Sequence, residues 1–195
     1  MSKMNSPLFI FLVAKEYFEN GTLYASKYFK MSKDGTIKSF DNLIHAKLCV
    51  PATNISFSLE LVLKAFLMQT GLKKFDHNLH KLFELLPANV KSEIIEHYNS
   101  HDIYKNYITV QLINGDGTEH GKIKRSYYSK KSAEFIPLML DTHKLAFLNF
   151  RYLHEFQGNQ TQDFYFREFS NFTFSALSVL GKSLDLVVVS TPLNK

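Results

Sequence analysis

The chain has 195 residues, of which 45% are hydrophobic and 21% charged, and its formal net charge is +5. These values are ordinary for one globular domain and exclude a disordered or low-complexity protein, while the small excess of cations permits an acidic partner without requiring one. The single cysteine, Cys49, excludes an intrachain disulfide and fits a reducing cytoplasm, so we expect a cytoplasmic protein with one domain over residues 1–195.

The N-terminal segment is apolar at helical spacing. Residues 7–14 could pass for the hydrophobic part of a signal peptide, but a charged pair follows at once and the apolar pattern continues beyond it. We therefore expect a structural helix over about residues 8–30, weakened at Asn20-Gly21, and no membrane segment. The apolar run 184–189 near the other end is too short to cross a bilayer.

A second helix is expected over about residues 41–70, kinked or split at Pro51. Ser56, Glu60 and Lys64 recur on it at intervals of four residues, which places them on one face of the helix. Apolar residues surround that line almost completely, so the two charges form either a narrow solvent edge or a buried site in which they are paired. We expect Glu60 to be mostly buried.

Turn and cap signals divide the next part of the chain. Gly71 is a suitable C-terminal cap for the second helix. Asp76 is a good N-cap, so a third helix is predicted from there to Leu86. Pro87 interrupts it, and a short helix over about residues 89–98 should follow.

A change of pattern predicts an insertion near residues 107–128. Residues 107–113 are rich in β-branched and aromatic side chains, residues 114–117 read Asn-Gly-Asp-Gly, and residues 122–128 could be the returning strand. These signals favour a β-hairpin or a long loop that projects from the bundle.

Two more helices are expected over about residues 129–156 and 165–190. The predicted fold class is therefore all-α, a bundle of about five helices that carries the one insertion.

Three separated motifs share their order and spacing with a known family. Residues 56–67 read Ser-x-x-x-Glu-Leu-x-Leu-Lys-Ala-x-Leu, a His-x-Leu-x-x-Leu run begins at His77, and Arg151-Tyr152-x-x-Glu155 lies on the fourth expected helix. Over roughly residues 45–90 and 143–185 they resemble the HEPN (higher eukaryotes and prokaryotes nucleotide-binding) family. The resemblance implies an up-and-down helical bundle that forms a homodimer, with His77 at a helix start and hydrogen-bonded to the preceding loop.

HEPN nucleases carry a His four to six residues after an Arg, where the pair cleaves RNA without metal. None of Arg125, Arg151 and Arg167 has a His at that spacing, and His154 lies only three residues after Arg151. The resemblance therefore implies a degenerate member that binds nucleic acid or a partner in a toxin–antitoxin or phage-defence system, a small nucleotidyltransferase being one candidate partner. The alternatives are a metal-independent ribonuclease with a non-standard site at Arg151, His154 and Glu60, and an interaction module without a nucleic-acid role.

Arg151 and Glu155 lie one helical turn apart and can face Glu60 and Lys64 across the bundle. The predicted polar cluster consists of Ser56, Glu60, Lys64, Arg151 and Glu155. It forms either an ion-paired network that fixes helix register or a catalytic site, and the structural interpretation is favoured because buried charge networks often have no catalytic role. We expect Glu60, Glu155 or both to hold the guanidinium of Arg151.

Residues 122–131 contain five cations and no acid. Aromatic side chains can stack on unpaired bases while cations hold phosphates, so RNA is a candidate ligand, although an ordinary solvated surface would have the same composition. The candidate contact residues are Lys122, Lys124, Arg125, Tyr127, Tyr128, Lys130 and Lys131.

Two histidine pairs have spacings that can ligate zinc from one helix face, His77 with His80 and His97 with His101. Neither pair has the Glu of a His-Glu-x-x-His motif, and His101 should lie beyond the end of its helix. We therefore expect no metal and no cofactor.

Overall fold

The computed structural model describes residues 6–28, 44–72, 76–104, 109–112, 132–151 and 162–186. Along the chain the elements are α1 (Pro7–Tyr28), α2 (Ile44–Gln69), α3 (Leu79–Glu84), α4 (Ala88–Ser100), β1 (Thr109–Leu112), α5 (Ser132–Thr142), α6 (Ala146–Arg151), β2 (Gln162–Tyr165) and α7 (Phe166–Ser183). Most of the described residues are helical and both strands are short, which confirms the predicted all-α class. The up-and-down HEPN topology remains a prediction.

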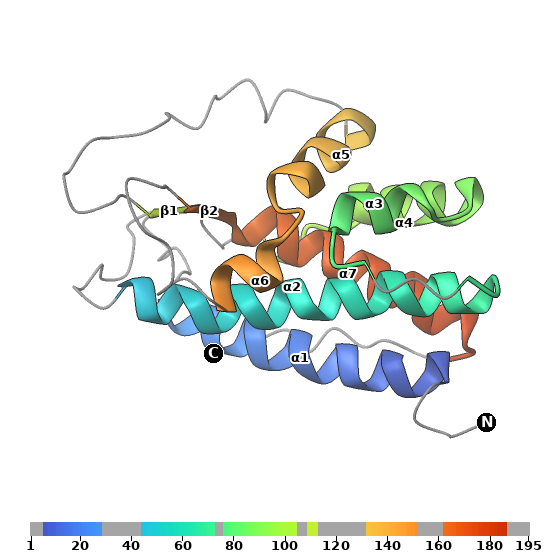
Figure 1. The fold of residues 1–195 in the computed structure, drawn as a ribbon, viewed down its shortest axis with the longest axis horizontal. Helices are drawn as coiled ribbons and strands as arrows, with labels where there is room; N and C mark the ends of the chain where they lie inside the picture. Colours follow the sequence, from blue (N-terminus) through green and yellow to red (C-terminus); the bar gives the residue numbers. More distant parts are fainter. Residues whose placement is uncertain are drawn as a thin grey trace.

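The two longest helices, α1 and α2, lie antiparallel and side by side along the long axis of the molecule (Figure 1). The expected weakening at Asn20-Gly21 is not observed, because α1 continues through both residues. A Cβ atom on Gly21 would lie 2.7 Å from Cγ1 of Ile55 and 3.2 Å from its backbone nitrogen. Gly21 is therefore a point of close approach between the two helices rather than a helix break.

The end of α2 follows the prediction. Gly71 has a positive φ of 82°, its N–H donates to the carbonyl of Met68 at 3.1 Å, and the N–H of Leu72 donates to the carbonyl of Leu67 at 2.9 Å. These bonds form a Schellman motif, for which glycine is the preferred residue. Pro51 lies inside α2 and does not split it.

The start of α3 differs from the prediction. Asn78, not Asp76, is its N-cap, and Oδ1 of Asn78 accepts the N–H of Lys81 at 3.0 Å. Asp76 instead accepts the N–H of Asn78 at 3.0 Å, which holds the segment before the helix in a turn. This later start leaves His77 outside the helix, from where its side chain reaches α2.

The single helix predicted over residues 129–156 is two helices in the structure, α5 and α6, joined by a turn at His143–Leu145. The carbonyl of Lys144, which a continuous helix would use internally, accepts the N–H of Leu79 at 2.9 Å. The turn therefore satisfies a donor at the start of α3. Residues 152–156 of the predicted helix lie outside the described residues.

The last helix ends earlier than the expected residue 190. After Ser183 the N–H of Leu186 donates to the carbonyl of Gly181 at 2.8 Å, and Asp185 has a left-handed φ of 57°. Aspartate tolerates this conformation better than most residues, so it replaces the glycine that usually marks such an end.

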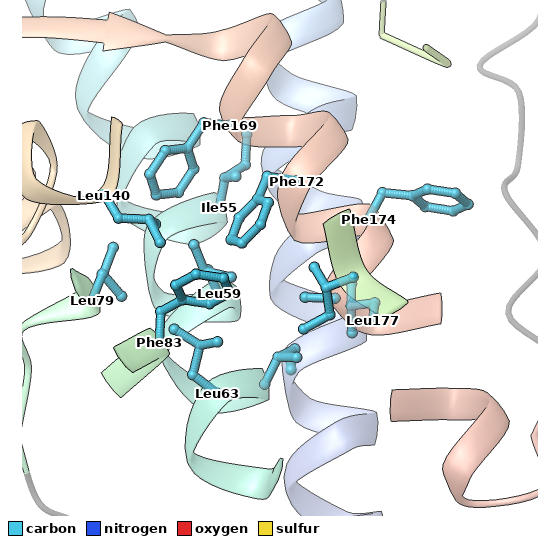
Figure 2. Packing of buried hydrophobic residues seen from close by; sticks show 14 of the residues in the cluster. Ile55, Leu59, Leu63, Leu79, Phe83, Leu140, Phe169, Phe172, Phe174 and Leu177 are labelled. Atoms are coloured by element: carbon cyan, nitrogen blue, oxygen red, sulfur yellow. The ribbon is translucent and has the colours of Figure 1, made fainter. Parts of the chain in front are cut away.

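The core is formed where α7 crosses α2. Figure 2 shows Phe169 and Phe172 of α7 directed toward Ile55 and Leu59 of α2, with Phe83 of α3 beside them. The rings of Phe83 and Phe172 meet edge to face, with centroids 5.6 Å apart. This packing buries the apolar faces of α2, α3 and α7 together and fixes the position of the polar residues on α2.

The two strands pair with each other. β1 and β2 are antiparallel, with Thr109 opposite Tyr165 and Leu112 opposite Gln162. The predicted strand near residue 110 is thus confirmed, and its partner among the described residues is Gln162–Tyr165. The turn at 114–117 and the segment 122–128 lie outside the described residues, so the local hairpin between 107–113 and 122–128 stays a prediction.

Candidate functional site

The polar line on α2 is present as predicted. Ser56, Glu60 and Lys64 lie on α2, and Glu60 is 1% exposed, which confirms its expected burial. The hydroxyl of Ser56 donates to the carbonyl of Ala52 at 2.6 Å, one turn earlier on the same helix. Ser56 therefore lies on the same face as Glu60, but its hydroxyl bonds a backbone carbonyl of α2 and not the carboxylate.

The carboxylate of Glu60 is the centre of the site. Its Oε1 accepts from Nζ of Lys64 at 2.7 Å and from Nδ1 of His77 at 2.9 Å. Its Oε2 is buried and has no hydrogen-bond partner among the described residues. One oxygen thus carries two charge-assisted bonds, while the other lies in the low-dielectric interior without one.

His77 makes a contact that the sequence does not predict. Its ring bonds Glu60 on α2, and residues 73–75 of the preceding loop lie outside the described residues. Because a carboxylate can only accept, Nδ1 donates, and in the neutral ring Nε2 keeps its lone pair. The His77 side chain is 47% exposed. The arrangement is therefore an imidazole that a buried carboxylate orients toward solvent, with the ammonium of Lys64 on the same oxygen.

The side chains of the other predicted site residues are not among those that the structure describes. Arg151 ends α6, which packs against α2, but its side chain is not among those described. His154 and Glu155 lie outside the described residues, as does the whole basic stretch 122–131. The proposed bond between Arg151 and Glu60 thus stays a prediction, and the observed partners of Glu60 are Lys64 and His77.

A second polar network, absent from the sequence-based prediction, joins the end of α4 to the start of α7. Asp102 accepts from Nε and Nη2 of Arg167 and, at 2.8 Å, from Nδ2 of Asn171. The Oδ1 of Asn171 in turn accepts the N–H of Tyr104 at 3.1 Å. The bond to Asp102 raises the pKa of the Arg167 guanidinium. Three donor atoms of two side chains thus converge on one carboxylate, which suits a structural clamp between distant segments.

Glu168 lies next to this clamp and is buried. Its Oε2 has no hydrogen-bond partner within the described part of the chain, and burial raises the pKa of its carboxyl group. Desolvation of the charged form is the main cause, and the nearby cation of Arg167 only partly opposes it.

The His97 and His101 rings stack with centroids 4.0 Å apart. Nδ1 of His97 bonds Oγ of Ser175 at 3.1 Å, and Nδ1 of His101 donates to the carbonyl of His97 at 2.9 Å. His101 follows the last residue of α4, as expected. Burial and the neighbouring His101 lower the pKa of His97. Across the described residues no group of three His, Cys, Asp or Glu side chains could hold a metal ion.

His143, in the turn between α5 and α6, is a buried titratable residue that the sequence did not single out. It is surrounded by the rings of Phe164, Tyr165 and Phe169, with centroids 5.2–5.3 Å away. Its Nε2 has no hydrogen-bond partner among the residues that the structure describes. Burial lowers the pKa of His143 to about 3, so the ring is neutral at physiological pH and serves as packing.

Cys49–Gln69 within α2 is long and apolar enough to span a membrane, but 67% of that stretch is buried within the bundle. Burial of this kind is expected of a core helix in a globular protein, and the helix also carries the Glu60–Lys64 ion pair.

No protein-family model matches the chain, and comparisons with curated proteins and with solved structures give no match either. The likeness to HEPN proteins therefore rests on the three sequence motifs described above.

Proposed function

We propose that this chain is a HEPN-like protein without the usual nuclease motif, which acts as a homodimeric nucleic-acid- or partner-binding module of the toxin–antitoxin or phage-defence type. The observation that carries the proposal is the pairing of the buried Glu60 carboxylate within the bundle. Lys64 and His77 both bond its Oε1, so the carboxylate ties α2 to the segment before α3. A buried charge that is paired within the bundle fits a structural role, which leaves binding as the function of the surface.

The chemistry of the sequence supports binding over cleavage. Metal-free RNA cleavage needs a base for the ribose 2′-hydroxyl and a cation near the scissile phosphate. The Arg-to-His spacing that supplies both in HEPN nucleases is absent. The basic stretch 122–131 would supply phosphate contacts and stacking rings without the reactive pair.

A binding titration with structured RNA tests the nucleic-acid role. We expect affinity to fall as salt rises, with a slope of about 0.7 per phosphate contact on single strands. Replacing Lys124, Arg125, Lys130 and Lys131 with Ala should weaken binding and flatten that slope. The matched control replaces four lysines of the described bundle with Ala: Lys81, Lys91, Lys144 and Lys182. It should change neither the affinity for RNA nor the salt slope. If the two variants weaken RNA binding equally, the basic stretch has no specific role in binding.

The protein-partner role has its own test. A small nucleotidyltransferase is the partner class that the HEPN resemblance implies, so a neighbouring gene of that kind should be co-expressed with this chain. Co-elution of the two proteins supports the proposal, and separate elution at micromolar concentration counts against this partner class.

One observation favours the ribonuclease alternative in a modified form. The half-exposed His77 is oriented by a buried carboxylate, which is how many enzymes position a general base. This version adds His77 and Lys64 to the three residues of that alternative, Glu60, Arg151 and His154.

Two variants decide the question. His77→Gln should abolish RNA cleavage if His77 is the base. His80→Gln, a change in the first turn of α3, should preserve cleavage. For Arg151→Ala, a stability loss of about 3–5 kcal/mol indicates a structural ion pair. Lost cleavage with an unchanged melting temperature indicates catalysis instead. We expect no cleavage by the parent chain.

A further inference from the structure

Large apolar side chains are exposed on one face of α1. Leu8, Phe9 and Leu12 near its start and Leu23 near its end are each more than two-fifths exposed. At 100° per residue they fall on one half of the helix, opposite the side that packs into the core through Phe11, Ala14, Phe18 and Ala25. So many large apolar residues on one exposed face indicate an interaction surface.

A shallow hollow of about 450 Å³ lies beside the second half of this face, between α1 and α2. Its lining mixes apolar and polar side chains, among them Glu16, Asn20, Leu23 and Lys27 of α1 and Val50 of α2. One end of α1 thus presents projecting apolar side chains, and the other end presents a depression.

We propose that a second copy of this chain lies antiparallel along α1. The positions that would meet it are spaced alternately by four and three residues, the spacing found where two helices pack along their length. This seam consists of Phe9, Val13, Glu16, Asn20, Leu23 and Lys27. The inference rests on the homodimer in the proposed function and names its interface.

The seam is complementary to itself in one antiparallel register. When Glu16 of one copy meets Asn20 of the other, the amide can donate to the carboxylate. The same register places Val13 opposite Leu23, and it brings the ammonium of Lys27 to the ring of Phe9. Phe9 is therefore brought to the hollow that Lys27 lines.

A parallel pair would have the opposite electrostatics. Glu16 would meet Glu16, and Lys27 would meet Lys27, so like charges would face each other. The projecting apolar residues would also meet one another, and both hollows would stay unfilled. Charge and shape thus select the antiparallel arrangement.

Analytical ultracentrifugation of the full chain at micromolar concentration tests the interface. The parent should have twice the 22.6 kDa mass of one chain. Leu23→Glu should halve the mass, because it places a charge in the seam, opposite Val13 of the other copy. Leu85→Glu is the matched control, since Leu85 is exposed to a similar extent (44% against 47%) but follows α3. Circular dichroism of both variants verifies that they are folded. A monomeric parent, or a dimeric Leu23→Glu protein, would overturn the proposal.

Cross-linking tests the orientation, and neither experiment depends on nucleic acid. In a Cys49→Ser background, single cysteines replace Tyr17 or Leu8. In the proposed register the two copies of residue 17 lie beside the symmetry axis, whereas the copies of residue 8 are about 30 Å apart at 1.5 Å per residue. A short bismaleimide should therefore link the Tyr17→Cys dimer and not the Leu8→Cys dimer. Links at both positions, or at neither, refute the antiparallel register. Loss of RNA binding alone would count against the proposed function and leave this interface intact.

Discussion

At the scale of single residues, His143 shows how a titratable side chain couples stability to pH. Its folded-state pKa of about 3 lies below the ordinary value of 6.5, because burial disfavours the charged ring. Between these two values the unfolded chain binds more protons than the folded one. Stability is therefore complete above pH 6.5 and is lost as the pH falls toward 3, by up to about 1.4 kcal/mol per pH unit.

We predict that His143→Leu reduces the acid sensitivity of the protein. The variant removes the buried ring nitrogen, so the fall in melting temperature between pH 7 and pH 4.5 should be smaller than in the parent. Other groups titrate equally in both proteins and cancel in the comparison. His80→Ala, a change at a partly exposed imidazole, is the control. An identical pH dependence in the parent and in His143→Leu would show that His143 does not govern acid unfolding.

The candidate site could be predicted only where residues share one helix. Regular spacing placed Ser56, Glu60 and Lys64 on one face, and the apolar neighbours of Glu60 predicted its burial. The contact with His77 depends on how the chain turns back after Gly71, which no helical period encodes. The Asp102–Arg167 clamp likewise joins residues far apart in the sequence.

At the scale of elements, helix ends that depend on a backbone requirement were the most predictable. Gly71 ends α2 because a left-handed residue is needed there. The start of α3 lies two residues later than predicted: Asp76 and Asn78 are both good N-cap residues, and Asn78 is the one that accepts the N–H of Lys81. The break at His143 has neither Gly nor Pro, so no local signal marks it.

Gly21 offers a test of packing between elements. Gly21→Ala should gain about 1 kcal/mol of helix propensity but lose about 1–3 kcal/mol by overpacking against Ile55. We expect a net loss of about 1 kcal/mol, which is a fall of about 2–4 °C in melting temperature for a chain of this size. Ser26→Ala, five residues later on α1, should leave the free energy of unfolding within about 0.5 kcal/mol of the parent. An increase in melting temperature for Gly21→Ala would mean that α1 and α2 move apart at little cost.

At the scale of the whole molecule, the helical class could be predicted and the strand pairing could not. Apolar periodicity identified the helices, including the long pair α1 and α2. The helices α5 and α6 lie between β1 and β2 in the sequence. Predicting the pairing therefore requires the tertiary arrangement that brings the two strands together. Nothing in four residues of each strand specifies that partner, so the nearer segment 122–128 was the expected one.

The β1–β2 ladder also closes a long loop, because residues 113–161 lie between the two strands. The entropy lost on closure grows slowly with loop length, about 0.6 kcal/mol for each doubling, and the short ladder must offset it. β2 leads directly into α7, so its position is set once α7 has packed against α2. β1 should therefore join late in folding and open early. By hydrogen exchange, the amides of Thr109–Leu112 should exchange many-fold faster than those of residues 55–63 in α2. Equal protection would mean that the ladder opens only when the entire bundle unfolds.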